Sequence, residues 1–516
     1  MIIIRNIIQE SDDPKKLNKK IGKLIKRDDF SYEIYRKSID SRKGIKYNFQ
    51  VLVDLKLSEK EVKKIKNAEI YEPKDLEIKI KNPPKEVSIV GTGPAGLFCA
   101  YVLAHNKVKV KVYERGEEIK DRIKTIENFK NGGKLNTESN IQFGEGGAGT
   151  YSDGKLTARS KDPRVRYVLE TFHKNGAPDE ILIDNKAHIG TDLLRDVITN
   201  MRKEIIKNGG EFYFSHRLDD IKIKSNEVEN IIINGKEKQS GAYVLALGNS
   251  ARDTFEMLSQ KIQMENKNFA VGLRIEHKRQ TINKAQYNGK ETDSQGKLLP
   301  QASYNLTYNN KEKNLSAYTF CMCPGGYVVN ASSEEEKLCV NGMSYHDRDG
   351  ENSNSAIIVT IDEKTYGRKI LDGMKFQREI ENRTYKLGNG KVPVQRFADY
   401  KKNTPTEDLG KIKPSVQSPY TLANLRGIYP KEIEEMIIEA IESMGEKIKG
   451  FNDDDAILSA AETRSSSPIR MLRDENNKSL GINNLYVIGE GSGYSGGIVS
   501  SAIDGIKTAQ FILEKE

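Results

Sequence analysis

The strongest constraint on the fold of this chain is a glycine pattern within residues 87 to 104, "VSIVGTGPAGLFCAYVLA". A short apolar stretch runs into Gly91, Gly93 and Gly96, spaced as G-x-G-x-x-G, and an apolar helical stretch follows. A tight turn, a close approach of the backbone to a pyrophosphate and close helix–strand packing each favour glycine at these positions. The following helix presents free N–H groups and a positive dipole end to phosphates. The pattern predicts a strand, a turn and a helix that bind a dinucleotide.

An acidic residue follows at the end of the next expected strand, "VKVKVYE", whose last residue is Glu114. An acid roughly 20 residues beyond the glycines can accept hydrogen bonds from ribose hydroxyls. Its charge would repel a 2′-phosphate, so an adenosine with a free ribose is expected, from FAD or NAD rather than NADP.

A second strand, glycine turn and helix are expected near the C-terminus, in "NNLYVIGEGSGYSGGIVSSAIDGIKTA". Glu490 stands at the carboxyl end of the expected strand, and Gly496, Gly497 and Ile498 begin the helix. An NAD enzyme needs no second segment of this kind. In an extended FAD, an acid there can hold a ribityl hydroxyl, and the helix N-terminus can stabilise charge on a reduced flavin. The two segments together indicate FAD.

These two segments resemble the FAD proteins related to glutathione reductase and fumarate reductase. More narrowly, "SNIQFGEGGAGTYSDGKL", "AHIGTD", "LALGNSARDT", "GLRIEH", "TFCMCPGGYVVNASSE" and "AETRSSSPIR" are similar to a bacterial family usually called uncharacterised FAD-dependent dehydrogenases. The resemblance covers residues 87 to 516, and residues 1 to 86 match more loosely. It implies a flavoprotein with a redox role and a nucleotide-binding Rossmann fold, but it implies no substrate.

The stretch "GEGGAGTYSDGKL", residues 144 to 156, is expected to lie along the flavin, because related flavoproteins bring the corresponding loop to the isoalloxazine. A flexible surface loop is the alternative. Arg122 resembles an arginine that pairs with phosphate, although an ordinary surface arginine is an equal alternative. The expected FAD-binding residues are Gly91, Gly93, Pro94, Ala95, Gly96, Glu114, Arg115, Arg122, Gly146, Gly147, Ala148, Gly149, Ser152, Gly248, Gly489, Glu490, Gly496, Gly497 and Ile498.

Residues for the substrate side are harder to assign, and the catalytic residues remain open. Histidine can exchange a proton as a hydride moves, and arginine can bind a carboxylate substrate with two parallel hydrogen bonds. Each candidate also has a structural interpretation, as a hydrogen-bonded core residue or a member of an ion pair. The candidates are His188, Arg274, His277, Glu462 and Arg464.

The four cysteines lack metal or disulfide spacing. Cys321 and Cys323, in "TFCMCPGG", are interpreted as two residues on one face of a strand rather than as a redox pair. Cys99 is expected to be a small buried residue of the first helix. No metal site is expected.

Residues 1 to 82 are predicted to form a separate basic domain. Residues 1 to 85 contain 22 Lys and Arg against 14 Asp and Glu, a net of +8, while the whole chain has +9. Apolar alternation and helix-start signals, including Pro14 after Asp13 and the pair Ser58 and Glu61, predict the order β-α-β-β-α-β of a ferredoxin-like domain. Its last strand is expected at 75–80, "DLEIKI".

The predicted fold class is α/β. The FAD-binding domain is expected at 85–265 and 451–516, with an α+β substrate or cap domain inserted at 266–450. Charged residues make up 30% of the chain, and the sequence has no apolar run approaching about 18 residues, so a cytoplasmic protein with no membrane partner is expected.

The expected activity is that of an FAD-dependent oxidoreductase or dehydrogenase. It would transfer a hydride between the flavin and a small organic molecule, with NAD(P)H as a transient electron donor at the flavin. An alternative is a tRNA-modifying flavoenzyme that docks RNA through the lysines of residues 15 to 26 together with Arg36, Lys37, Arg42, Lys43 and Lys46. A flavin-binding module without turnover is a third interpretation. The substrate and the oligomeric state stay open.

Overall fold

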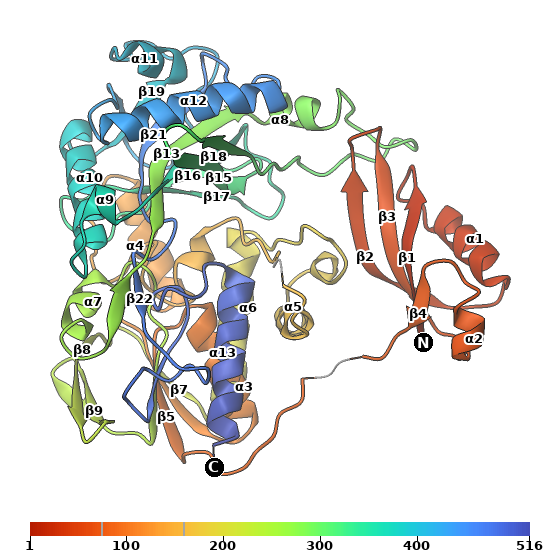
Figure 1. The fold of residues 1–516 in the computed structure, drawn as a ribbon, viewed down its shortest axis with the longest axis horizontal. Helices are drawn as coiled ribbons and strands as arrows, with labels where there is room; N and C mark the ends of the chain where they lie inside the picture. The colour runs from red at the N-terminus through yellow and green to blue at the C-terminus, as the bar shows by residue number, and fades with distance from the viewer. Residues whose placement is uncertain (74–75, 158–159, 516) are drawn as a thin grey trace.

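The computed structural model describes residues 1–73, 76–157 and 160–515, which form three parts (Figure 1). A nucleotide-binding domain contains the two glycine segments. An inserted domain built on a large sheet lies above it in the view of Figure 1, and a small N-terminal unit lies to one side.

The nucleotide-binding domain is built on a five-stranded parallel sheet in the order β23-β11-β5-β6-β7. The strands are β5 (Glu86–Val90), β6 (Lys109–Tyr113), β7 (Glu211–Tyr213), β11 (Ala242–Leu245) and β23 (Leu485–Val487). The last strand in the chain therefore pairs beside strands from the first half, as expected for a cofactor bound by two distant segments.

Helices α3 (Pro94–His105) and α13 (Ile498–Leu513) pack against each other beside this sheet. Glycines permit the close approach. A Cβ on Gly96 would lie 2.0 Å from the carbonyl oxygen of Gly91, and a Cβ on Gly505 would lie 2.1 Å from that of Ala95. Any larger side chain at either position would push the helix away from its neighbour.

Further elements complete this domain. They are α4 (Ile119–Lys130), the 3₁₀ turns η1 (Ala148–Tyr151) and η2 (Asp179–Leu182), α5 (Arg164–Lys174), α6 (Thr191–Lys207), the antiparallel strands β8 (Leu218–Lys224), β9 (Glu227–Ile233) and β10 (Lys236–Lys238), and α7 (Arg252–Leu258).

The inserted domain contains a seven-stranded sheet in the order β14-β15-β18-β13-β21-β19-β20. Its strands are β13 (Phe269–Lys278), β14 (Thr307–Asn310), β15 (Leu315–Cys323), β18 (Asn352–Ile361), β19 (Val392–Arg396), β20 (Tyr420–Leu422) and β21 (Ile457–Glu462). A hairpin of β16 (Tyr327–Asn330) and β17 (Val340–Met343) adjoins it, with helices α8 (Arg279–Gln286), α9 (Glu363–Tyr366), α10 (Asp372–Gly388), α11 (Phe397–Lys402) and α12 (Lys431–Lys447).

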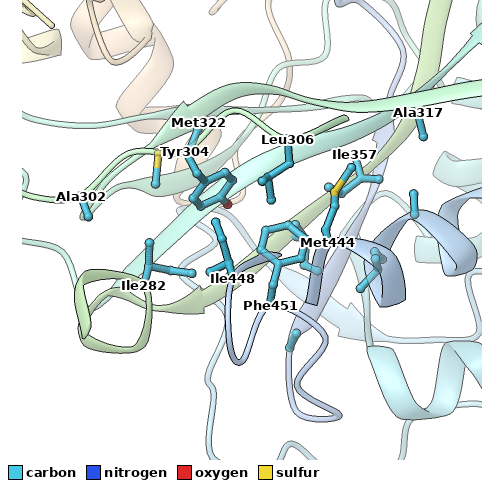
Figure 2. Packing of buried hydrophobic residues seen from close by; sticks show 14 of the residues in the cluster. Ile282, Ala302, Tyr304, Leu306, Ala317, Met322, Ile357, Met444, Ile448 and Phe451 are labelled. Carbon is cyan, nitrogen blue, oxygen red and sulfur yellow. The ribbon is translucent and has the colours of Figure 1, made fainter. Parts of the chain in front are cut away.

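The core of this domain lies between the sheet and α12, where aromatic and aliphatic side chains interleave (Figure 2). The rings of Tyr304 and Phe451 meet edge to face, with centroids 5.4 Å apart. The Tyr304 hydroxyl donates to Ser355 at 3.0 Å, so the polar end of this buried ring is satisfied.

The boundary expected at 450 is wrong by one strand. β21, expected in the second part of the nucleotide-binding domain, instead pairs with β13 and β19 in the sheet of the inserted domain. The two chain crossings between the domains are β12 (Met264–Asn266) and β22 (Ile469–Met471), which pair with each other. β21 has the sequence "ILSAAE" and is buried along its whole length, which fits a central strand of either sheet, so periodicity alone does not distinguish them.

The N-terminal unit has the expected element order: β1 (Ile2–Gln9), α1 (Pro14–Ile25), β2 (Tyr32–Asp40), β3 (Lys46–Val53), α2 (Glu59–Val62) and β4 (Ala68–Ile70). Its antiparallel sheet has the order β2-β3-β1-β4. The helix-start signals are confirmed, since Asp13 caps α1 and Ser58 forms a capping box with Glu61.

The strand expected at 75–80 is wrong. The last strand of the sheet is β4, and residues 76–80 have no regular secondary structure; Asp75 lies outside the described residues. Asn67 has a left-handed φ of 60° and turns the chain directly into β4. The fourth strand therefore begins several residues before the stretch "DLEIKI", where apolar alternation predicts it.

Backbone hydrogen bonds join the N-terminal unit to the nucleotide-binding domain. The Lys37 N–H donates to the carbonyl of Ile183 at 2.7 Å, and the Asn185 N–H donates to the carbonyl of Lys37 at 2.8 Å. The Lys37 ammonium lies 3.4 Å from Asp12 and 3.3 Å from Asp184. No helix in the described ranges is long and apolar enough to cross a membrane.

A buried ionic cluster joins the nucleotide-binding domain to the inserted domain. The carboxylate of Glu381, on α10, accepts two hydrogen bonds from Arg252 at 2.8 Å and two from Arg464 at 3.0 and 2.8 Å. These two guanidinium groups hold the pKa of Glu381 well below its usual value, although burial opposes them. The cluster therefore stabilises the protein above the unfolded pKa of Glu381, near 4.5, and that contribution is lost as the pH falls through the folded pKa.

We expect Glu381→Gln to lower the free energy of unfolding by about 3–5 kcal/mol at neutral pH, because two buried arginines lose their counter-ion. Urea unfolding of the purified variants measures this change. Glu379→Gln is the matched control on the same helix, since this side chain is 64% exposed and should change stability by about 1 kcal/mol or less. Equal, small effects in both variants would contradict the role of the cluster.

Candidate functional site

A cavity of about 630 Å³ opens at the carboxyl ends of the parallel strands, below the inserted domain. The segments that line it are the turn from β5 to α3, the residue after β6, the stretch 147–155, the end of β11 and the turn from β23 to α13. β15, β17 and β21 of the inserted domain also contribute. Crevices at this edge of a doubly wound sheet are where ligands bind.

Three of the glycines that line the cavity have no structural reason to be glycine. A Cβ on Gly93, Gly248 or Gly496 would meet nothing within 4 Å, and none of the three has a positive φ. Among the glycines of the described ranges, only these three combine open space with an ordinary φ. By contrast, Gly91 has a φ of 102° and its Cβ would lie 2.4 Å from the carbonyl oxygen of Ala246. The space beside the three glycines fits a ligand that approaches the backbone, as a bound dinucleotide does.

Both helix N-termini of the two glycine segments face this cavity. Gly93 is the N-cap of α3 and Gly497 is the N-cap of α13, and both line the cavity. No side chain caps α3, so the N–H groups of its first turn remain available to an anion. Phosphate oxygens fit this environment because the two positive dipole ends converge there.

Glu114 lies at the cavity directly after β6, as expected, and is itself held by four donors. Thr92 donates from its N–H and its hydroxyl at 3.0 and 2.7 Å, and the N–H groups of Gly116 and Gly144 donate at 3.0 and 3.1 Å. The carboxylate thus fixes the position of the first glycine turn relative to the loop at 144. Its contact with a ribose stays a prediction.

Glu490 lies at the cavity at the end of β23. In the described part of the chain its carboxyl group accepts no hydrogen bond. Burial raises the pKa of Glu490 to about 8, while the ammonium of Lys267 opposes the shift. A carboxyl group with this raised pKa can donate a hydrogen bond to a ligand hydroxyl when it is protonated and accept one when it is ionised. Hydroxyl groups of a bound ligand would therefore provide the hydrogen-bond partners that Glu490 lacks.

The loop predicted to lie along the flavin is buried against the first glycine turn. The N–H of Gly146 donates to the carbonyl of Thr92 at 3.2 Å, and a Cβ on Gly147 would lie 3.1 Å from the Cα of Gly93. Gly147, Ala148, Gly149 and Ser152 line the cavity, whereas Gly146 packs behind it against Thr150 and Ile198. A flexible surface loop is therefore the wrong description of this stretch.

Arg122 does not fit the expected role in phosphate binding. Its side chain is fully buried, does not line the cavity, and donates to the backbone carbonyls of Asn140, Ile141 and Glu145 at 2.7–3.0 Å. It is not a surface arginine either. Its guanidinium satisfies three carbonyls that the turn at 140–145 leaves without backbone partners.

Arg115 lines the cavity, but its guanidinium pairs with Glu138 and Asp253 and lies over the ring of Phe143. The remaining expected residues, Pro94, Ala95, Gly489 and Ile498, also line it, and Gly96 packs behind the turn.

Of the five substrate-side candidates, the structure brings two to the cavity. Glu462 and Arg464 line it from β21 and the residues that follow. Burial raises the pKa of Glu462, while Arg274 opposes this by donating to its carboxylate at 2.9 Å. Arg464 is bound to Glu381 and donates to the Ser333 hydroxyl at 2.5 Å.

Arg274 lies behind the cavity wall. Besides Glu462, it donates to the side-chain oxygen of Asn341 at 3.2 Å and to the carbonyl of Cys321 at 3.2 Å. All three of these partners line the cavity. Arg274 therefore positions residues that line the cavity rather than facing it.

The two histidine candidates lie away from the cavity wall. His277 is buried in the core of the inserted domain, where its Nε2 bonds the carbonyl of Phe451 at 2.6 Å and burial lowers its pKa to about 4. His188 stacks on His346 and bonds its carbonyl at 2.9 Å, and burial lowers the pKa of His188 to about 4 as well. Both are hydrogen-bonded structural residues, which was the alternative interpretation.

Several residues at the cavity were missed by sequence reasoning. Lys155, Asn249, Cys321 and Asn341 all line it. The side-chain oxygen of Asn249 is buried without a hydrogen-bond partner, as a ligand-binding group would be. Lys155 lies within the stretch 144–156 that is predicted to lie along the flavin, so its position in that stretch was the available signal.

The family comparisons agree with this geometry. Residues 268–465 match the family described as "FAD-dependent protein, C-terminal domain-like", and residues 89–148 match the "NAD(P)-binding Rossmann-like domain". An uncharacterized protein from Clostridium beijerinckii is 44% identical over 529 residues, which span 100% of this chain and 99% of that protein.

Solved structures of FAD proteins are more remotely similar. Glycine oxidase from Bacillus cereus is 12% identical with a TM-score of 0.33, and 84% of this chain and 96% of that chain are covered. A mutant of quinol fumarate reductase from E. coli is 11% identical with a TM-score of 0.38, covering 83% and 70%. From the family matches and the full-length relative, the chain belongs to a family of FAD-dependent proteins and carries a Rossmann-like nucleotide-binding domain.

Proposed function

We propose that this protein is a cytoplasmic FAD-dependent oxidoreductase that transfers a hydride between the flavin and a small organic substrate. The observation that carries the proposal is the single cavity shared by two helix N-termini, three open glycines and polar side chains of the inserted domain. The helix N-termini and the open glycines suit a dinucleotide. The polar side chains of the inserted domain suit a substrate that lies between that domain and the dinucleotide.

The residues that would hold FAD come from both glycine segments. The N–H groups of the first turn of α3 would bind the pyrophosphate, Glu114 would bind the adenosine ribose, and Glu490 would bind a ribityl hydroxyl. The N-terminus of α13 would face the pyrimidine end. When bound, FAD supplies the two-electron chemistry of the isoalloxazine.

The substrate side would be formed by the inserted domain. Glu462 and Asn341 present polar groups to the cavity, and Arg274 fixes both of them. Burial raises the pKa of Glu462, which suits a group that exchanges a proton with a substrate. Arg464 adds positive charge that favours an anionic substrate. NAD(P)H would serve as a transient electron donor that enters the same cavity.

The alternative of a tRNA-modifying enzyme depends on one continuous basic face in the N-terminal unit. The lysines of residues 15 to 26 lie on α1, whereas Arg36 and Lys37 contact Asn185 and Asp184 at the junction with the nucleotide-binding domain. These contacts make Arg36 and Lys37 less available to RNA than the lysines of α1, which favours the small-molecule proposal. We also infer that the unit is a ferredoxin-like domain, which its strand order supports.

The proposal is tested by an anaerobic absorbance spectrum of the protein incubated with FAD, recorded before and after NADH and then NADPH. We expect a flavin spectrum that a nicotinamide donor bleaches, because the proposal assigns NAD(P)H the role of electron donor. A bound flavin that no nicotinamide bleaches would redirect the search to substrate-reduced chemistry. A protein that stays colourless after FAD is added would falsify the proposal.

Alanine substitution at each of the three open glycines should weaken FAD binding without lowering the stability of the flavin-free protein. Gly93→Ala, Gly248→Ala and Gly496→Ala should each weaken FAD binding about tenfold or more, because each Cβ enters ligand space. The same variants should leave the thermal midpoint of the flavin-free protein unchanged or slightly raised. Gly96→Ala is the contrasting variant, since its Cβ would clash with the chain itself and lower the midpoint. Binding is measured by titration of flavin fluorescence.

The raised pKa of Glu490 should appear in the stability of the flavin-free protein. Its proton is held more tightly in the folded state, so stability should fall as the pH rises from about 4.5 to about 8 and then level off. Glu490→Gln should remove this part of the pH dependence and be more stable than the parent protein at pH 8. Thermal midpoints from pH 5 to 9 measure both. Parallel profiles for the two proteins would show that Glu490 is not responsible.

A further inference from the structure

Two cysteines of β15 flank a break in the strand at the cavity. The pairing of β15 with β18 shifts between Phe320 and Cys323, and Cys321, within the break, has a left-handed φ of 43°. Cys321 lines the cavity and Cys323 is buried behind it. The expectation of two ordinary residues on one strand face is therefore wrong at this position, because the irregularity reorients Cys321.

The two cysteines lie close together in the broken segment of the strand. The Cys323 thiol donates to the carbonyl oxygen of Cys321 at 3.3 Å. Arg274 donates to that same carbonyl at 3.2 Å. The Lys155 ammonium donates to the carbonyl of Met322, the residue between the two cysteines. Cationic donors from two other elements thus hold this short segment in place.

The charges around Cys321 favour its thiolate. The neighbouring Cys323 thiol lowers the pKa of Cys321, with help from the positive charges of Lys155 and Arg274 and against burial. The charge of Asp153 opposes this shift, and the Cys321 thiolate in turn raises the pKa of Glu462 and of Glu490. The neighbouring Cys321 likewise raises the pKa of Cys323 well above its ordinary value. One thiolate beside one protonated thiol is the arrangement of a reactive dithiol.

The other two cysteines provide an internal comparison. Cys99 and Cys339 are fully buried away from the cavity, and burial raises the pKa of both thiols. Inert structural cysteines have this environment, whereas reactive ones are partly exposed and lie near positive charge.

We infer that Cys321 and Cys323 form a redox-active dithiol that exchanges two electrons with the flavin of the proposed function, on which this inference rests. On oxidation, the Cys321 thiolate and the Cys323 thiol lose two electrons and the Cys323 proton, and an S–S bond forms between them. A bound isoalloxazine would supply the oxidant, since it would accept the two electrons and the proton that the pair releases. The reverse step reopens the disulfide, so the pair acts as a two-electron store beside the cofactor.

The first test needs no flavin. The flavin-free native protein is alkylated with iodoacetamide from pH 4 to 9, and the modified peptides are quantified by mass spectrometry. Cys321 should react along a titration curve centred below the ordinary thiol pKa, while Cys99 and Cys339 stay unmodified. Cys323→Ala should move the curve of Cys321 to higher pH, because alanine removes the neighbouring thiol. A curve for Cys321 centred near the ordinary thiol pKa, about 8.5, would overturn the inference.

The second test counts electrons in the flavin-loaded protein. After oxidation with diamide and removal of the reagent, an anaerobic dithionite titration should consume two more electrons per flavin in the parent protein than in Cys321→Ser or Cys323→Ser. Bound flavin with equal electron uptake in all three proteins would overturn the inference and leave the proposed function intact. Failure of the parent protein to bind flavin would overturn both.

Discussion

The site depends on one packing constraint, the close contact of α3 with its neighbours through Gly96 and Gly505. Because neither position has a side chain, α3 lies against the strand turn on one side and α13 on the other. The two helix N-termini consequently open into the same cavity, and the electrostatic field of both acts on one ligand. The G-x-G-x-x-G pattern thus combines two kinds of glycine: Gly91 and Gly96 serve the fold, and Gly93 leaves room for a ligand.

The opposite wall of the cavity is organised by buried charge. Glu381 binds two arginines, Arg252 from the nucleotide-binding domain and Arg464 from the segment after β21, while Arg274 binds Glu462 and Asn341. Such clusters are strongly directional, because each guanidinium presents its donors in one plane. They fix the inserted domain relative to the dinucleotide side, so that both halves of the cavity keep their relative position.

The sequence predicted features that depend on local pattern and failed where distant contacts decide. The strand–turn–helix segments, Glu114, Glu490 and the caps of α1 and α2 are local, and the structure places all of them as expected. Arg122 could not be assigned, because its partners are carbonyls about 20 residues away that only the folded turn brings together. The same holds for His277, whose partner lies 174 residues away, and for Cys321, which a strand irregularity turns toward the cavity. β21 was misplaced because a strand without polar alternation fits the centre of either sheet.

The nucleotide-binding domain is discontinuous, and this has a consequence for how the protein is made. β23 and α13 come from residues 485–513, and the segment that leaves the N-terminal unit bonds to them, Lys81 to the carbonyl of Leu513 and Gln510 to that of Glu77. During synthesis the cavity has only one of its two helix N-termini until residues 485–513 emerge from the ribosome. A nascent chain therefore acquires its complete dinucleotide site only after α13 has been made, and a chain truncated before α13 lacks it.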